Sequence, residues 1–326
     1  MTEGPTTPLR AEQYLAPETL SQLASFELRA KMVAEGAMNG LHVSPRQGAA
    51  VEFASHRQYT TGDSVRHLDW KVFARNDKLY IKQYQQETNL NITILVDGSA
   101  SMKFGTLDTK SGWGGTKAQG ITNRWTKYDH ATAVAAAISF LSLSQRDRVS
   151  LGIFSDGIRG GVRRSSSSDH WRSVVRCLAA EPMETKVNWP KVAEQALSQN
   201  QGHTLFVIIS DFLAPLEQVR AVLARLRHRG NDVIIFVTLD NAEIEFDLDV
   251  DAPFVGLEGE PTIEIDSRSV RDAYKKALQT HLQEIDRISR SFGFDCAVFN
   301  THKSVGPILS SLLAKRQAFA RQRSSR

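Results

Sequence analysis

An acid and two hydroxyls, Asp97, Ser99 and Ser101, follow the apolar stretch of residues 92–96 at every second position. The β-branched residues of that stretch favour a buried strand. In extended backbone, side chains at i, i+2 and i+4 point the same way. We therefore expect one carboxylate and two hydroxyls to converge just past the end of the strand. Open α/β sheets bind ligands at that end, and oxygen-only donors suit a divalent cation such as Mg²⁺.

Two further oxygen donors can complete such a site. Asp211 follows the apolar run of residues 205–209, and in a doubly wound sheet that second strand can neighbour the first. Thr185 lies in a loop between two expected helices. Mg²⁺ requires nearly octahedral geometry and usually retains some water. The predicted metal ligands are Asp97, Ser99, Ser101, Thr185 and Asp211.

The rest of the chain alternates between strand and helix patterns, which predicts an α/β fold with a doubly wound, mainly parallel sheet covered on both faces. Buried strands are expected near residues 92, 150, 205, 234 and 296, with a short returning edge strand over 157–163. Helices are expected over 128–143, 170–180, 189–199, 216–229 and 270–291. These elements must hold the oxygen donors at one edge of the sheet.

Three parts are predicted along the chain. Residues 1–88 contain an N-terminal helix from Pro17 to about Gly36 and a small β-containing segment with a strand over 79–84. Residues 89–300 form the α/β domain. Residues 301–326 form a C-terminal helix and a basic tail. We interpret that tail as a solvated chain end.

Composition excludes some classes of function. The net charge of +4 over 326 residues is too small to indicate a nucleic-acid partner, and no base-reading motif is present. Cys177 and Cys296 have no metal-ligand or redox spacing and are interpreted as buried thiols. Neither a signal-peptide core nor a membrane-spanning stretch is recognised. We expect a cytoplasmic protein, and peripheral membrane association stays open.

The oxygen donors resemble the metal-ion-dependent adhesion site of von Willebrand factor A domains, which consists of Asp-x-Ser-x-Ser, a distant Thr and a distant Asp. Asp97, Ser99 and Ser101 match the first element, Thr185 is assigned as the distant Thr, and Asp211 matches the last. Neutral oxygens leave a bound cation electrophilic, so an acidic side chain of another protein can complete its coordination. The resemblance therefore implies a protein-interaction module.

A second resemblance lies upstream. Its residues are Glu52–Phe53, Arg57-x-Tyr59, Gly62–Asp63, Arg66, Leu68–Asp69–Trp70 and Ala74–Arg75. They are similar to the signature of the bacterial family named domain of unknown function 58, whose members carry this segment before an A-type domain. Genes of that family commonly accompany a MoxR-type AAA ATPase, so the resemblance implies an adaptor of such an ATPase. The charges of the segment form either a partner-binding patch or, as we favour, an internal salt-bridge network.

An enzyme is the alternative. A strand that ends in an acid also begins metal-dependent phosphatases and phosphotransferases that use the aspartate as nucleophile, which here would be Asp97. Those enzymes place a second acid two residues later, where this chain has Ser99. We therefore prefer a non-enzymatic module that holds Mg²⁺, or Mn²⁺ or Ca²⁺, and expect no catalytic residue. The Gly-rich stretch 105–126 is expected to form a rim whose Trp113 and Trp125 can contact a partner.

Overall fold

The structure is a computed structural model. It describes residues 53–59, 69–76, 78–84, 90–108, 124–180, 185–200, 202–246, 256–257, 262 and 267–305. The chain forms two compact units, one of residues Val43–Asn89 and one that contains the chain from Leu90 onward. The predicted N-terminal helix, the tip of the 105–126 loop with Trp113, and the C-terminal helix and basic tail lie outside the described residues.

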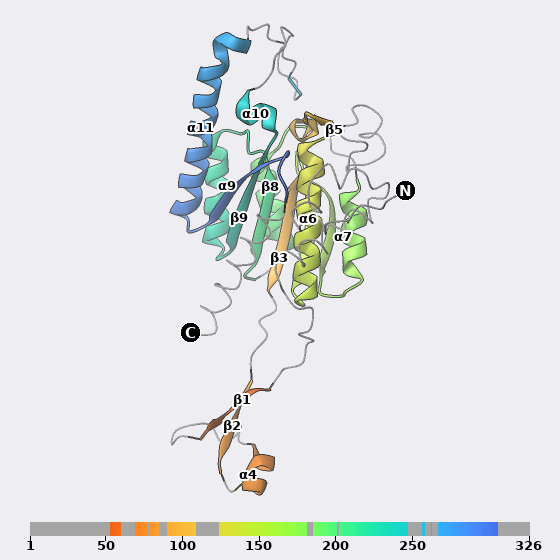
Figure 1. Cartoon of the computed structure of the whole chain (residues 1–326), viewed down its shortest axis with the longest axis vertical. Coiled ribbons are helices and arrows are strands. Elements are labelled where there is room, and N and C mark those ends of the chain that lie inside the picture. Colours follow the sequence, from red (N-terminus) through yellow and green to blue (C-terminus); the bar gives the residue numbers. More distant parts are fainter. Residues whose placement is uncertain are drawn as a thin grey trace, which may run out of the picture. The chain divides into compact units, whose positions relative to one another are not determined.

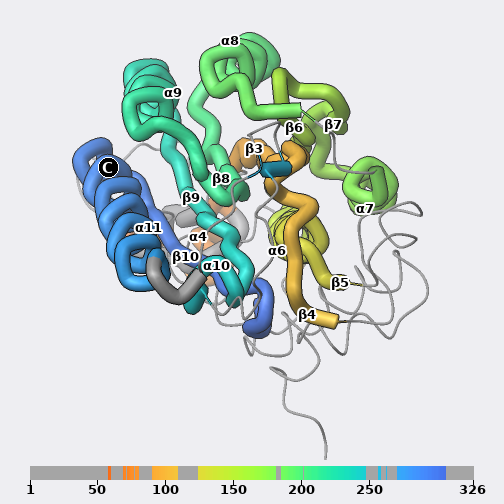
Figure 2. Tube along the Cα trace, turned by 90° about the horizontal axis from the view of Figure 1, so that it is seen from above, coloured from red at the N-terminus to blue at the C-terminus, as the bar shows by residue number. Residues whose placement is uncertain are grey.

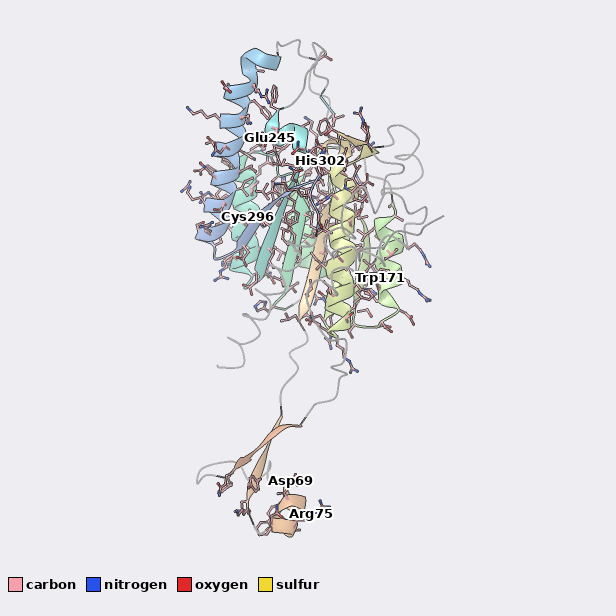
Figure 3. The ribbon with its side chains drawn as sticks, viewed as in Figure 1. Asp69, Arg75, Trp171, Glu245, Cys296 and His302 are labelled. Atoms are coloured by element: carbon pink, nitrogen blue, oxygen red, sulfur yellow. The ribbon has the colours of Figure 1, made fainter. Side chains whose placement is uncertain are left out.

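The small unit is built on an antiparallel strand pair, β1 (Phe53–Gln58) with β2 (Tyr80–Tyr84), and one helix, α4 (Trp70–Asn76). The predicted strand over 79–84 is confirmed. Asp69 is buried, and its Oδ1 accepts a hydrogen bond of 3.3 Å from the Val72 backbone at the start of α4. Arg75, at the other end of this helix, is exposed (Figure 3). The remaining charges of the signature lie outside the described side chains, so the internal network stays a prediction.

The larger unit has a six-stranded sheet in the order β10-β9-β8-β3-β6-β7. Figure 1 labels β9, β8 and β3 of this sheet. All neighbouring strands are parallel except β7, which pairs antiparallel with β6 at one edge. The predicted doubly wound, mainly parallel sheet and its returning edge strand are confirmed. The strands are β3 (Asn91–Asp97), β6 (Arg148–Phe154), β7 (Ile158–Ser165), β8 (Leu205–Ser210), β9 (Asp232–Leu239) and β10 (Asp295–Asn300).

Helices cover both faces of this sheet, as Figure 2 shows. The helices are α6 (Lys127–Ser144), α7 (His170–Leu178), α8 (Trp189–Gln199), α9 (Leu216–His228), α10 (Asn241–Glu245) and α11 (Ser267–Ser291). Successive residues of β3 point to opposite faces: Ile94 packs in the core under α6 and α7, whereas Leu95 packs in the core under α8, α9 and α11. The strands are therefore apolar throughout, as parallel strands buried on both sides require.

Helix α6 is the most deeply buried helix of the described chain. Its first turn lies at the edge of the sheet where the parallel strands end. Its N-cap is Thr126, whose side chain accepts from the Asp129 backbone while Asp129 in turn accepts from the Thr126 backbone. This capping box fixes where the helix begins. A run of alanines lets the helix lie close to β3 and β6. As a result Lys127, in the first helical turn, is carried into the interior with 1% of its surface exposed.

Two expectations about the side chains are wrong. Trp125 is fully buried in the core, and its indole Nε1 donates to His130 Nδ1 at 3.4 Å, so it is no partner contact. It belongs to the short strand β5 (Arg124–Trp125), which pairs with β4 (Leu107–Asp108). Cys177 and Cys296 are both partly rather than fully buried.

Candidate functional site

The candidate site lies where β3 and β8 end. Asp97 is the last residue of β3, and Asp211 directly follows β8. The two strands are adjacent and parallel, with Val96 paired to Ile209. The sequence indicated that these two strands can neighbour each other, and in the structure they do. Both carboxylates are therefore brought to the carboxyl edge of the sheet, and both are almost completely buried.

Asp97 is held by hydrogen bonds on both of its oxygens. Its Oδ1 accepts from the Ser99 backbone N–H at 2.8 Å, and its Oδ2 accepts from Ser210 Oγ at 2.6 Å. Burial, and then the nearby charge of Asp211, raise the pKa of Asp97 to about 7 although these hydrogen bonds act the other way. These hydrogen bonds fix the orientation of the Asp97 carboxylate, and no cationic side chain pairs with it among the described residues.

Ser99 and Ser101 converge beside Asp97, with their Oγ atoms 3.1 Å apart. The spacing rule assumed extended backbone throughout, but only Ser99 is extended, and the chain turns from Ala100 onward. Ala100–Lys103 forms a 3₁₀ helix, η2, which begins directly after Ser99. The two hydroxyls meet because the chain turns sharply here, and the Met102 backbone donates to the Ser99 carbonyl at 3.2 Å within this turn. The prediction of convergence holds, but its geometric reason is different.

Asp211 joins the same cluster from the neighbouring strand. Its Oδ1 accepts from the Leu213 backbone at 3.2 Å, and its Oδ2 accepts from Lys127 Nζ at 2.9 Å. A side-chain hydrogen bond also links it to Ser101. Burial would raise the pKa of Asp211, but the charge and hydrogen bond of Lys127 outweigh burial and lower it. The pKa of Asp97 is therefore raised, whereas the pKa of Asp211 is lowered.

Thr185 lies beside this cluster and is not hydrogen-bonded into it. Its side chain is exposed, and its Oγ1 donates to Ser155 Oγ at 2.8 Å. Its carbonyl accepts from the Ala100 backbone at 3.3 Å, which ties the Thr185 loop to the η2 turn. The residue thus supports the loop that carries the serines. Its role as a metal ligand stays a prediction.

A cavity of about 270 Å³ opens onto the cluster. Asp97, Ser101 and Asp211 form part of its wall, and Trp189 and Leu213 are among its apolar lining residues. Half of the Leu213 surface is exposed. Buried oxygens at the base of the cavity and exposed apolar surface at its side are suited to receiving a polar group carried by a larger molecule.

Sequence reasoning missed three residues that shape the site: Lys127, Ser210 and Glu243. Lys127 bridges Asp211 and Glu243, with its Nζ 2.7 Å from Glu243 Oε1. Glu243 lies in α10, after the end of β9. Ser210 could have been found from the sequence, because it directly precedes Asp211 at the end of a strand. Nothing in the local sequence marked Lys127 or Glu243, because their partners are far away along the chain.

The donor set fits a hard divalent cation. It offers carboxylate and hydroxyl oxygens only, which are the ligands that Mg²⁺ and Ca²⁺ prefer. Among the described residues no group of three or more His, Cys, Asp or Glu side chains is arranged to hold a metal. A cation at this edge would therefore depend on the serine hydroxyls together with the two aspartates.

The fold and site define an α/β domain with an acid and hydroxyl cluster at the carboxyl edge of a doubly wound sheet. A family model described as "Protein of unknown function DUF58" matches residues 55–284, and the chain belongs to this family. Two relatives are the uncharacterized proteins Rv1480 of Mycobacterium tuberculosis (strain H37Rv) and Mb1516 of Mycobacterium bovis. Each is 26% identical over 285 residues, which cover 85% of this chain and 83% of the relative.

Solved structures with some likeness include the conserved hypothetical protein BatB from Bacteroides thetaiotaomicron and the SpRpn10 VWA domain. BatB is 12% identical with a TM-score of 0.39, over 72% of this chain and 98% of its own. The SpRpn10 domain is 11% identical with a TM-score of 0.36, over 70% of this chain and 95% of its own. These likenesses are remote, and the fold is defined by the strand order of the sheet itself. None of the described helices combines the length and apolar character that crossing a membrane requires.

Proposed function

We propose that this chain is a protein-interaction module that holds a divalent cation at Asp97, Ser99, Ser101 and Asp211 and uses it to bind an acidic side chain of a partner. One observation carries the proposal: two buried carboxylates and two hydroxyls from adjacent strand ends meet within one hydrogen-bonded cluster at a cavity. Mg²⁺ is the preferred ion on donor chemistry, and Mn²⁺ or Ca²⁺ are alternatives.

The electrostatics of Asp97 support a cation at this place. A buried carboxylate beside a second carboxylate is unfavourable in its charged form, which is why its pKa is raised. A divalent cation would remove that penalty and favour the ionised acid. No hydrogen bond of the Thr185 side chain joins it to the other four residues, and its Oγ1 donates to Ser155 instead, so we assign the cation to those four. Two serine hydroxyls and two acids leave coordination positions for water and for a ligand from outside.

Binding suits this cluster better than catalysis does. A phosphatase of the aspartate type needs a second acid to move a proton, and Ser99 stands at its place. Ser99 is itself fully buried, and the Ser210 hydroxyl donates its hydrogen bond to Asp97. We therefore propose a non-enzymatic, cytoplasmic adaptor. Its proposed partner is a MoxR-type AAA ATPase, on the basis of the family resemblance of the residue 52–75 segment.

The first test is titration of the chain with Mg²⁺ by calorimetry. The variant Ser99→Ala/Ser101→Ala should lose measurable binding, because it removes two oxygen donors while leaving the carboxylates. Ser144→Ala is the matched control, since Ser144 is an exposed serine at the opposite end of α6 whose Oγ donates to the Phe140 carbonyl. Equal Mg²⁺ affinity in the double variant and the control would refute the metal assignment.

The second test addresses the partner. Capture of the ATPase by the immobilised chain should occur with Mg²⁺ and fail with EDTA, and the double serine variant should behave as EDTA does. Equal recovery under all three conditions would argue against adhesion through the cation. Phosphatase turnover that is lost in Asp97→Asn would instead favour the enzyme alternative.

A further inference from the structure

Lys127 is a buried cation placed directly against the candidate site. Its ammonium group lies 2.9 Å from Asp211 Oδ2 and 2.7 Å from Glu243 Oε1, and the ring of Phe104 lies 5.9 Å away. Its side chain is 1% exposed. Burial of a lysine is costly unless its charge is paired. Two carboxylates around one ammonium group satisfy that requirement.

The position of Lys127 separates it from the cavity. Asp97, Ser101 and Asp211 line the cavity, together with residues of α8, α9 and the loops before them, whereas Lys127 and Glu243 do not. Lys127 approaches Asp211 from α6, which packs on the other face of the sheet. Asp211 therefore has the cavity on one side and an internal cation on the other.

The single positive charge of Lys127 does not neutralise the carboxylates of this site equally. Burial by itself would lower the pKa of Lys127, but Asp211 and Glu243 raise it above its ordinary value, so the ammonium group stays charged. Burial raises the pKa of Glu243 in spite of Lys127. Lys127 thus shares one positive charge between Asp211 and Glu243, while Asp97 has no cationic partner among the described residues.

We propose that Lys127 is a positioning residue that acts as a resident counter-cation for Asp211 and thereby limits the affinity of the site for a divalent cation, with Glu243 drawing part of that charge away. The inference rests on the proposed function. Lys127 occupies one oxygen of Asp211 and neutralises much of its charge, so a cation in the cavity would be held mainly by Asp97 and the serines. Such a cation is loosely bound and strongly electrophilic, which suits reversible adhesion to an acidic side chain.

A purely structural role for the same ion pairs makes a different prediction. If Lys127 only stabilised the fold, removal of either Lys127 or Glu243 would loosen the site, and both changes would weaken metal binding. If Lys127 is a competing cation, the two changes act in opposite directions. Removal of Lys127 strengthens metal binding, and removal of the Glu243 charge weakens it because the ammonium group is then paired with Asp211 alone.

The experiment is Mg²⁺ calorimetry on Lys127→Met, Glu243→Gln and the native chain, with thermal melts in EDTA and in Mg²⁺. Methionine keeps the length and helix propensity of the lysine, and glutamine keeps an oxygen that can accept from the Asp240 backbone, as Glu243 Oε2 does at 2.8 Å. Lys303→Met is the control, because Lys303 is an exposed cation that follows β10 at the same edge of the sheet.

We expect Lys127→Met to bind Mg²⁺ about tenfold more tightly and Glu243→Gln several times more weakly. Lys303→Met should change the affinity by less than about twofold. Lys127→Met should also melt at a lower temperature than the native chain in EDTA and gain more from Mg²⁺, because the metal replaces the missing charge. The thermal melts measure this effect of Mg²⁺ without the need for a partner protein or an activity assay.

The outcomes separate the inference from the proposed function. If the native chain binds Mg²⁺ and Lys127→Met binds equally or more weakly, the inference is overturned and the proposed function stands. If the native chain does not bind but Lys127→Met does, the inference is supported and adhesion through the metal is refuted for the native chain. If neither binds Mg²⁺, both are overturned.

Discussion

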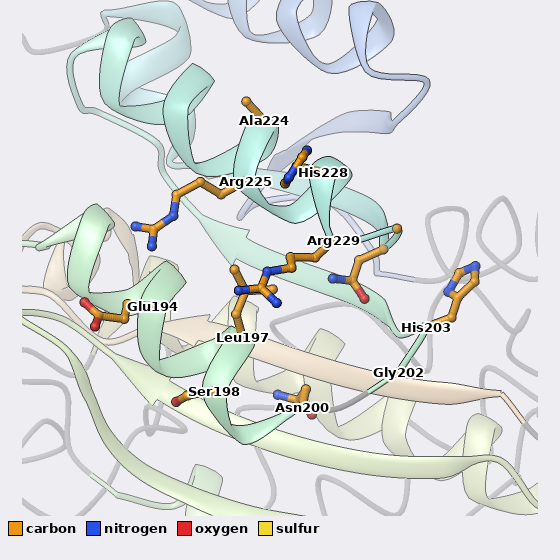
Figure 4. Close-up of a pocket in the computed structure, with 12 residues that line it drawn as sticks. Glu194, Leu197, Ser198, Asn200, Gly202, His203, Ala224, Arg225, His228 and Arg229 are labelled. Atoms are coloured by element: carbon orange, nitrogen blue, oxygen red, sulfur yellow. The ribbon is translucent and has the colours of Figure 1, made fainter.

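The two ends of the parallel strands differ in how their polar residues are held. At the carboxyl edge, small buried side chains are locked by the backbone and by one another around a cavity of about 270 Å³. At the amino edge, a cleft of about 1140 Å³ lies where α8 and α9 end (Figure 4). Three charged residues that line it, Arg225, Arg229 and Glu194, are all exposed.

The comparison teaches that volume alone does not mark a functional site. The basic residues of the amino-edge cleft lie at the end of α9, where cations favourably meet the negative end of the helix dipole, so a local structural reason accounts for them. The carboxyl-edge donors have no such local reason to be buried. Burying two carboxylates near each other costs free energy, and that cost makes the smaller cavity the more informative one.

The largest expected contrast between the two edges is in stability. Lys127→Ala should lower the free energy of unfolding in EDTA by about 3–5 kcal/mol, because it leaves the buried Asp211 and the partly buried Glu243 without their cation. Arg225→Ala should change it by no more than about 0.5 kcal/mol, because Arg225 is exposed. Urea denaturation followed by circular dichroism measures both. A loss below about 1 kcal/mol for Lys127→Ala would mean that water or a rearranged partner replaces the ammonium group.

The next contrast is the response to Mg²⁺. At a concentration of 1,000 times its Kd, a ligand specific for the folded state adds about 4 kcal/mol to the free energy of unfolding. We expect the native chain to gain this amount and Asp97→Asn to gain nothing, because asparagine supplies no charge to the cation. Denaturation with and without the ion provides the measurement. A full Mg²⁺ gain in Asp97→Asn would place the ion somewhere other than the carboxyl edge.

A smaller contrast concerns pH and the histidines of the two edges. Burial, and then the charge of His302, lower the pKa of His130 to about 4, and its Nε2 has no hydrogen-bond partner among the described residues. Between about pH 6.5 and 4 the unfolded chain therefore binds more protons at this residue. The His130 contribution to stability is present above pH 6.5 and falls by up to about 3 kcal/mol as the pH decreases to 4.

Asp97 acts in the opposite direction over nearly the same range. Its raised pKa, about 7 against an ordinary 3.8, makes stability increase as the pH falls through this window. The difference between the native chain and His130→Gln, measured by urea denaturation at several pH values, isolates the histidine. His228→Gln, a change at an exposed histidine of the amino edge, is the control. An identical profile for all three chains would show that His130 is not buried as a neutral ring.

The smallest expected effect is that of the amino-edge cations on the metal. Arg225→Ala/Arg229→Ala should leave the Mg²⁺ affinity within about twofold of the native value at physiological salt, because exposed charges at the far end of the strands are screened. Calorimetry at low and at physiological salt checks this. A change of tenfold or more would mean that the two edges are coupled through the sheet, and the contrast between them would need revision.

Much of the fold followed from local patterns. Apolar runs with β-branched residues marked the strands, and Gly157–Arg163 was expected to return as an edge strand, as β7 does. Asp97 and Asp211 were placed at strand ends because each acid follows an apolar run, and a charged side chain is disfavoured inside a strand that is buried on both faces. Trp125 was misjudged because its flanking Gly- and polar-rich stretch resembled a surface loop. Its burial is decided by the pairing of β4 with β5 and by packing against α6.

The sequence by itself determined where the strands lie along the chain, the two acids at strand ends and the serine spacing, because each depends on neighbours within a few residues. Only the tertiary structure decided what those acids contact. Asp97 meets Ser210 across 113 positions, and Asp211 and Glu243 meet Lys127 across 84 and 116 positions. Burial of a charge depends on which partners the whole fold brings within about 3 Å, and no local pattern encodes that.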